Sequence, residues 1–291
     1  MKPRARLLAL CVVLATRALA QAPALVWETD GFVGPESVVF DASRNQFYVS
    51  NMGTHGNGAT PGDGFISRVS ADGKILELKW VTGLTDPKGL ALANGQLYVG
   101  DDPGMAEIDI AAGKLVTWHK PDDGGKGDFN DCTADAAGNV YVCSGRLGTV
   151  FRLSGGKFAP WFKLDRSKTG GLNGLKAEKD RLLLGGWSLR GADGKEQLGH
   201  ISTVAYADGA FGRIGDQPVC HVDGLEPDGK GGYTVTDWLT GDVLHVTADG
   251  KTSPLLSLGR GTADHTYLAE KQLLIIPQMM EHKLRAFRWA P

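Results

Sequence analysis

A short hairpin signal recurs five times along the chain at near-regular intervals. The copies lie at 70–74, 110–114, 154–157, 206–210 and 247–251, each with a glycine turn after a short alternating strand. The turn glycines at 73, 113, 156, 209 and 250 are separated by 40, 43, 53 and 41 residues. Turns of this kind between alternating runs predict β-hairpins. A period of roughly 40 to 50 residues with several short strands predicts a β-propeller with one four-stranded blade per repeat.

A second repeated unit precedes these turns and gives the number of blades. Each copy starts with a polar residue, continues through an apolar run and a turn, and ends in another apolar strand. The six copies begin at Glu36, Lys88, Asp131, Asn173, Asp223 and Asp264. The last copy lacks an outer strand, whereas residues 24–29 form a strand-like segment with no neighbour of its own. We therefore predict an all-β, six-bladed propeller whose N-terminal strand closes the last blade and removes its free edge.

The first 20 residues have the pattern of a secretory signal peptide. Basic residues at 2, 4 and 6 precede a short apolar core over 7–15, and 18–20 fits a small-x-small cleavage site. The apolar core is well short of the ~20 residues that span a bilayer, so we expect cleavage rather than an anchor helix. The predicted domains are a signal peptide over 1–20 and one propeller over 21–291, in a periplasmic or secreted protein.

Removal of the signal peptide changes the charge balance. It takes away four of the 31 basic residues and none of the 33 acidic ones, which leaves a formal net charge of −6. A mildly acidic surface argues against nucleic acid and anionic membranes as partners. We expect a small-molecule partner, and the sequence gives no indication of oligomeric state.

Three cysteines follow the expected cleavage site, and export permits disulfides. A symmetric turn at 135–139 would place Cys132 opposite Cys143 and allow a cross-strand disulfide. Two buried free thiols are the alternative, with equal weight. Cys220 is expected to be unpaired, and no two cysteines have a metal-binding spacing.

The innermost strands of a propeller begin near one mouth of the central channel, so the six leading residues should meet there. Four carboxylates, one amide and one amine would crowd together, and such carboxylates repel unless they are protonated or bridged by a cation. Oxygen ligands suit Ca²⁺ first, with Mg²⁺ and Mn²⁺ as alternatives. Zn²⁺ is less favoured, because only His265 lies nearby. The alternative for each polar residue is that it satisfies a local turn.

Four motifs together resemble the SMP-30/gluconolactonase/LRE-like family over roughly residues 30–290. They are Gly-Pro-Glu-Ser-Val at 34–38, Phe-Asn-Asp-Cys at 129–132, Leu-Asn-Gly-Leu at 172–175 and Val-Asp-Gly-Leu at 222–225. The resemblance implies a six-bladed propeller with one divalent cation, held by Glu36, Asn173 and Asp223. It also implies that Asn130 contacts substrate or metal-bound water. Asp128 stands where sugar-lactone hydrolases of the family have an arginine, so recognition of a polyhydroxylated substrate should differ here.

The predicted function is hydrolysis of a lactone or ester, in which the cation polarises the carbonyl and stabilises the oxyanion. The resemblance makes Asp223 the first candidate for the catalytic base, with Asp131 and His265 as alternatives. Lys88 would either bind a substrate carboxylate or neutralise the acidic ring.

Two long loops, 51–64 and 186–199, should border the same mouth, because both connect second to third strands of a blade. Trp187 and Arg190 in the second loop are therefore predicted to line the substrate pocket. The alternative function is a non-catalytic propeller of the NHL type that binds a ligand or protein and holds a structural cation. Ester hydrolysis that is lost when a chelator removes the cation would favour the hydrolase over the non-catalytic propeller.

Overall fold

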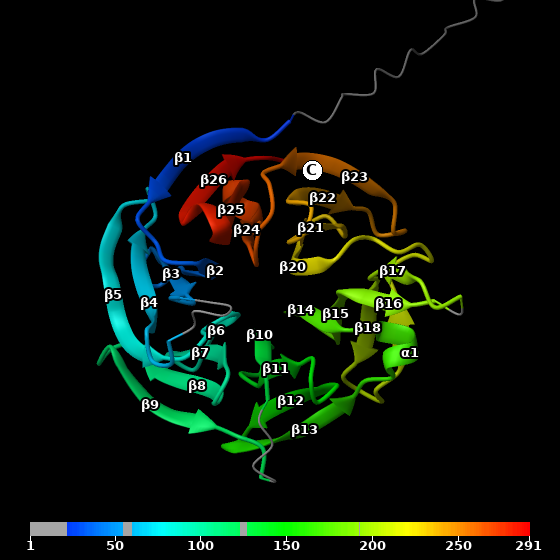
Figure 1. The fold of residues 1–291 in the computed structure, drawn as a ribbon, viewed down its shortest axis with the longest axis horizontal. Helices are drawn as coiled ribbons and strands as arrows, with labels where there is room; N and C mark the ends of the chain where they lie inside the picture. Colours follow the sequence, from blue (N-terminus) through cyan, green and yellow to red (C-terminus); the bar gives the residue numbers. More distant parts are fainter. Residues whose placement is uncertain (1–21, 55–59, 123–126, 192) are drawn as a thin grey trace, which may run out of the picture.

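The computed structural model describes residues 22–54, 60–122, 127–191 and 193–291. Within these ranges the chain forms six four-stranded antiparallel sheets, arranged as blades around a central axis (Figure 1). This confirms the predicted all-β, six-bladed propeller. The predicted signal peptide lies outside the described residues. No described helix is long and apolar enough to cross a membrane.

Each of the first five blades runs in chain order from its innermost strand outwards. Blade 1 contains β2 (Pro35–Asp41), β3 (Gln46–Asn51), β4 (Gly64–Ser70) and β5 (Ile75–Leu84). Blade 2 contains β6 (Leu90–Ala93), β7 (Gln96–Asp101), β8 (Gly104–Asp109) and β9 (Lys114–His119). Blade 3 contains β10 (Phe129–Ala134), β11 (Val140–Ser144), β12 (Thr149–Ser154) and β13 (Lys157–Lys163).

Blade 4 contains β14 (Leu172–Ala177), β15 (Arg181–Gly186), β18 (Ile201–Ala205) and β19 (Phe211–Arg213). It is preceded by the one-turn helix α1 (Arg166–Thr169) and carries an added hairpin of β16 (Ser188–Arg190) and β17 (Glu196–Leu198). Blade 5 contains β20 (Val222–Pro227), β21 (Tyr233–Asp237), β22 (Asp242–Val246) and β23 (Thr252–Ser257).

Blade 6 is built from both ends of the propeller. It contains β24 (Thr266–Leu268), β25 (Leu273–Gln278) and β26 (Lys283–Arg288), with β1 (Ala24–Asp30) as its outer strand. Strand β1 pairs antiparallel with β26, and Glu28 accepts hydrogen bonds from Lys283 (2.7 Å) and Arg285. In Figure 1 the blue strand β1 lies outside the red strand β26. The prediction that the N-terminal strand closes the last blade is confirmed.

The core is divided among the six interfaces between neighbouring blades. Six clusters of buried apolar side chains fill these interfaces, one for each pair of adjacent blades. For example, Tyr48 and Ile66 of blade 1 pack with Leu97 and Val99 of blade 2. Because each sheet is covered on both faces, its middle strands are almost entirely buried.

The register of β10 and β11 decides between the two alternatives for the cysteines. Cys132 lies opposite Val142, and Cys143 lies opposite Val150 on the next strand. An offset of one residue sends the two thiols to opposite faces of the sheet. Cys132 packs between blades 2 and 3 and Cys143 between blades 3 and 4, so the three described cysteines are free.

Candidate metal centre at the channel mouth

Three carboxylates from three blades meet where their innermost strands begin. Glu36 of β2, Asp131 of β10 and Asp223 of β20 each offer an oxygen, and these oxygens lie within 4.8 Å of one another. The three side chains are 5%, 1% and 1% exposed. Residues separated by about 90 positions in the sequence are thus concentrated at one end of the channel, hereafter the channel mouth.

A repeated irregularity in the backbone accompanies this convergence. The ladder between first and second strand shifts register between Pro35 and Val38, and at the equivalent point in blades 3, 4 and 5. Bulges of this type re-aim side chains and are frequent beside functional sites. The polar leading residue of each of these four blades lies within the shifted segment, which explains why it escapes ordinary cross-strand pairing.

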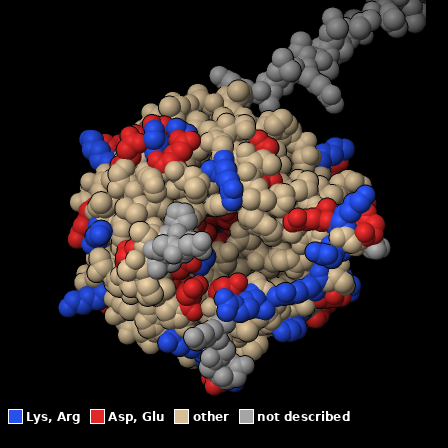
Figure 2. Space-filling model, viewed as in Figure 1, with Lys and Arg blue, Asp and Glu red and all other residues tan. Residues whose placement is uncertain are grey.

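Two amides and several larger side chains complete the channel mouth. Asn130 donates a hydrogen bond to the side chain of Asn173, which is 8% exposed. A cavity of about 200 Å³ opens above the carboxylates, and its lining comprises Glu36, Met52, Lys88, Asn130, Asn173, Trp187, Asp223, Trp238 and Met279. Figure 2 shows acidic side chains inside the hollow at the centre of this face.

Burial and mutual repulsion oppose ionisation of the three carboxyl groups. Burial raises the pKa of Glu36 well above its usual range, and the charges of Asp223 and Asp264 raise it further. Burial likewise raises the pKa of Asp131, with added repulsion from Asp264 and Glu36. Burial and Asp264 raise the pKa of Asp223. The three carboxyl groups can be ionised together at low energetic cost only when a positive charge compensates them.

The same side chains carry unpartnered oxygens. Among the described residues, Glu36 Oε2, Asn130 Oδ1, Asp131 Oδ1 and Asp223 Oδ1 are buried without a hydrogen-bond partner. Buried polar atoms are normally paired, so a cluster of exceptions needs an explanation. Carboxylate and amide oxygens are the ligands that hard divalent cations prefer. The donor set therefore fits such a cation.

Lys88 supplies the positive charge that the chain itself brings to this site. Its ammonium donates to the Asp86 carboxylate at 2.7 Å, the Asp86 carbonyl at 3.1 Å and Asp102 at 3.4 Å. Burial alone would lower its pKa, but the charge and hydrogen bond of Asp86, together with the charges of Asp102 and Glu36, outweigh burial and raise it. Lys88 therefore stays protonated at neutral pH and partly offsets the acidic ring.

Asp264 and His265 lie away from the cavity at the channel mouth. Asp264 accepts a hydrogen bond from Ser37 Oγ at 2.6 Å and lines a separate polar chamber with the ion pair of Lys176 and Glu226. Burial raises its pKa to about 7. His265 Nε2 lies 2.7 Å from Thr234 Oγ1, and burial lowers its pKa to about 3. His265 is thus a neutral packed side chain outside the lining of either space.

The structure places the three remaining candidates in different surroundings. Trp187 lines the channel mouth. Asp128 instead accepts hydrogen bonds from Ser144 Oγ (3.1 Å) and the backbone N–H of Arg146 (2.8 Å), and so holds the turn after β11. Arg190 is exposed on β16 and lines a separate surface cavity beside α1. The segment 186–199 was expected to be a plain loop, and its hairpin is what turns Arg190 away from Trp187.

Sequence reasoning missed Trp238 and Met279 of the lining, and it placed Met52 at this mouth only as part of the loop 51–64. A positional signal could have found them. Each directly follows the second strand of its blade, as Trp187 does in blade 4.

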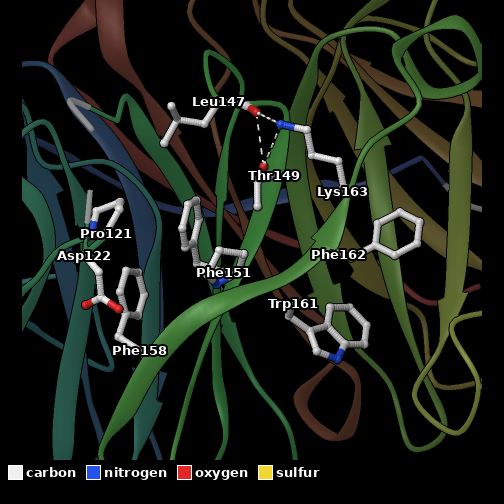
Figure 3. A pocket seen from close by; sticks show the side chains of 10 residues that line it. Pro121, Asp122, Leu147, Thr149, Phe151, Phe158, Trp161, Phe162 and Lys163 are labelled. Carbon is white, nitrogen blue, oxygen red and sulfur yellow. Dashed lines mark hydrogen bonds between the residues drawn. The ribbon is translucent and has the colours of Figure 1, made fainter. Parts of the chain in front are cut away.

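A larger cavity lies elsewhere, on the outer wall of blade 3. It measures about 590 Å³, and Figure 3 shows its aromatic side chains on both sides of β13. Phe151 and Phe158 lie on one side, and Trp161 and Phe162 on the other. None of the carboxylates at the channel mouth lines this cavity, so the cavity is not evidence about the candidate metal centre.

Comparison with known proteins finds solved structures with a similar fold. No protein-family model matches the sequence, and no curated protein resembles it closely enough to count as a match. A gluconolactonase from Xanthomonas campestris is similar over 92% of this chain and 95% of its own, with a TM-score of 0.68 and 15% identity.

Two further solved structures show the range of proteins with this fold. A candidate gluconolactonase from a structural genomics consortium covers 92% of both chains, with a TM-score of 0.65 and 17% identity. An auxiliary nutrient binding protein from Bacteroides thetaiotaomicron covers 90% of this chain and 70% of its own, with a TM-score of 0.66 and 11% identity. The chain therefore has the propeller fold of gluconolactonase structures, and its activity must be argued from its own site.

Proposed function

We propose that this protein hydrolyses lactones or esters with the help of one divalent cation at the channel mouth. The observation that carries the proposal is the cluster of three buried carboxylates with unpartnered oxygens, two of which, Glu36 and Asp223, line a cavity. Glu36, Asn173 and Asp223 would hold the cation, with Ca²⁺ preferred because every donor is oxygen. When bound, it would supply a Lewis acid that polarises the scissile carbonyl.

The side chains around the cluster have separable roles in this proposal. The backbone N–H of Leu175 donates to Asp131 Oδ2 at 3.1 Å, which leaves Oδ1 as the atom that can accept a proton from water. Asp223 is the other candidate base, by resemblance, but a carboxylate that holds a cation is a weaker base. Asn130 would orient the substrate, and Lys88 would stabilise the acidic ring. We further propose export to the periplasm or the medium.

The test uses purified protein from which divalent ions have been removed with a chelator. Hydrolysis of a panel of simple esters and lactones should be absent without metal and return with Ca²⁺. Asp223→Asn and Glu36→Gln should each lower kcat/KM by roughly 100-fold or more and weaken Ca²⁺ binding measured by calorimetry. Asp131→Asn should lower kcat while Ca²⁺ still binds. Asp128→Asn is the matched control and should keep both properties, because its side chain holds a turn.

Full hydrolysis in the presence of chelator would contradict the proposal, and so would an Asp223→Asn variant with wild-type turnover. A non-catalytic binding propeller is the second candidate, since a nutrient binding protein has the same fold. That candidate predicts a rise in Tm on addition of Ca²⁺ with no turnover of any compound in the panel.

A further inference from the structure

Large apolar side chains repeat around the channel mouth at one position of the blade. The residue after the second strand is Met52 in blade 1, Trp187 in blade 4, Trp238 in blade 5 and Met279 in blade 6. All four line the cavity above the carboxylates. The wall of the cavity is thus apolar on the side of four blades, whereas its floor is acidic.

The aromatic part of this wall is held in place. The rings of Trp187 and Trp238 have centroids 6.4 Å apart, and His221 lies 5.6 Å from Trp187. The guanidinium of Arg260 stacks on Trp238 at 4.9 Å. Asp237, the residue before Trp238, accepts hydrogen bonds from the backbone N–H groups of Leu239 (2.9 Å) and Thr240 (3.0 Å). Ordering these rings before a ligand arrives lowers the entropy lost on binding.

Polar side chains near the wall are already engaged with the protein. An ammonium has three donors, and the three contacts of Lys88 use all of them: two to Asp86 and one to Asp102. His221 Nδ1 lies 3.2 Å from Asp237. Apart from the donor set of the proposed cation, the described lining therefore offers no free charged group to a substrate hydroxyl, and the unpartnered amide oxygen of Asn130 is available to one group of the substrate.

We propose that the channel mouth selects lactones and esters whose non-reacting part is apolar, and disfavours polyhydroxylated sugar lactones. This inference rests on the proposed hydrolytic function and names its substrate class. A hydroxyl brought against Met52, Met279 or the ring face of either tryptophan would lose its hydrogen bonds to water without replacement, which costs roughly tenfold in affinity for each group. The cavity, of about 200 Å³, is smaller than the roughly 300–1,000 Å³ of pockets that bind drug-sized ligands, so a single ring with a short substituent fits best.

The experiment compares two lactones with the same six-membered ring, δ-hexalactone with one methyl substituent and glucono-δ-lactone with a polyol. In the Ca²⁺-loaded protein, kcat/KM divided by the uncatalysed hydrolysis rate should be at least about tenfold higher for δ-hexalactone. Trp187→Gln should lower this preference by roughly tenfold, and Trp187→Phe should retain most of it. Trp161→Gln on the outer wall is the matched control, and the ratio should not change, even if the variant is less stable.

The outcomes separate the two proposals. Higher normalised kcat/KM for glucono-δ-lactone would overturn the substrate class and leave the hydrolytic function standing. An unchanged preference in Trp187→Gln would also overturn it. Absence of turnover with both lactones and with the ester panel, in protein shown to bind Ca²⁺, would overturn the hydrolytic function and this inference with it.

Discussion

At the scale of single residues, the adjacent side chains of Asp264 and His265 lie in two different environments. Asp264 faces the polar chamber and accepts a hydrogen bond from Ser37. His265 packs behind it, is 1% exposed, and has Nδ1 without a hydrogen-bond partner in the described structure. Successive side chains point to opposite sides of extended backbone, so neighbours in the sequence need not share a role.

The buried His265 leads to a pH prediction. Its pKa is about 3 in the folded protein and 6.5 in the unfolded chain, so protons bind the unfolded state more tightly. The contribution of this residue to stability is complete above pH 6.5 and is lost as pH falls from 6.5 towards 3. The difference in Tm between the wild type and His265→Gln should therefore shrink between pH 7.5 and pH 4.5, measured by thermal denaturation. A difference that is constant across this range would show that His265 does not stay neutral in the fold.

At the scale of elements, the innermost strands of blades 4 and 5 approach each other through a glycine. A Cβ at Gly174 would lie 2.5 Å from the carbonyl oxygen of Asp223 and 3.3 Å from the Cα of Gly185. Such a contact involves backbone atoms, which cannot rotate away. The side chain missing at Gly174 thus lets the strand that carries Asn173 lie against the strand that carries Asp223.

Gly174→Ala should therefore separate β14 from β20 and disturb the donor set. We expect a loss of roughly 1–3 kcal/mol in the free energy of unfolding, measured in urea, because the added methyl group overpacks the interface. Weaker Ca²⁺ binding should accompany it. Gly171→Ala is the matched control, since its Cβ would lie 3.7 Å from the nearest atom, the Cβ of Trp187. Equal stability of the two variants would exclude a steric role for Gly174.

The elements were predictable from the sequence because their signals are local. Glycine turns and alternating runs predict strands, and six similar units predict six blades. Register was not predictable to one residue, since it depends on turn length and on the shift before Cys132. The hairpin of β16 and β17 was missed for a related reason: its strands are only three residues long and expose most of their side chains, so they lack an apolar pattern.

The candidate site could be predicted only in part. Glu36, Asn130, Asn173 and Asp223 occupy the same position in four repeats, at the start of the register-shifted segment, so the symmetry of the fold predicts that they converge. Asp131 lies one position later in its repeat and reaches the same cluster. Asp128 and Arg190 occupy no repeated position, and their directions are set by hydrogen bonds of the turn after β11 and by the added hairpin of blade 4. Such contacts depend on the folded backbone, which is why sequence alone did not place these two residues.

At the scale of the whole molecule, the ring is closed by hydrogen bonding between two ends of the propeller. Strand β1 supplies the outer edge of blade 6 and also contacts blade 1. The ring centroids of Trp27 and Phe47 are 6.2 Å apart, and Thr29 Oγ1 donates to the carbonyl of Gly73 at 2.5 Å. One seven-residue strand therefore joins the last blade to the first across more than 250 positions of sequence.

Removal of β1 should open the ring. A chain that begins at Gly31 exposes the edge of β26 and uncovers Phe47 and Gly73, whereas a chain that begins at Gln21 keeps both covered. An unpaired strand edge promotes association. We expect the shorter chain to melt at least about 10 °C lower and to form oligomers, seen by thermal denaturation and size-exclusion chromatography. Glu28→Gln, which removes only surface ion pairs, should cost under about 1 kcal/mol. A monomeric shorter chain with an unchanged Tm would show that blade 6 is stable with three strands.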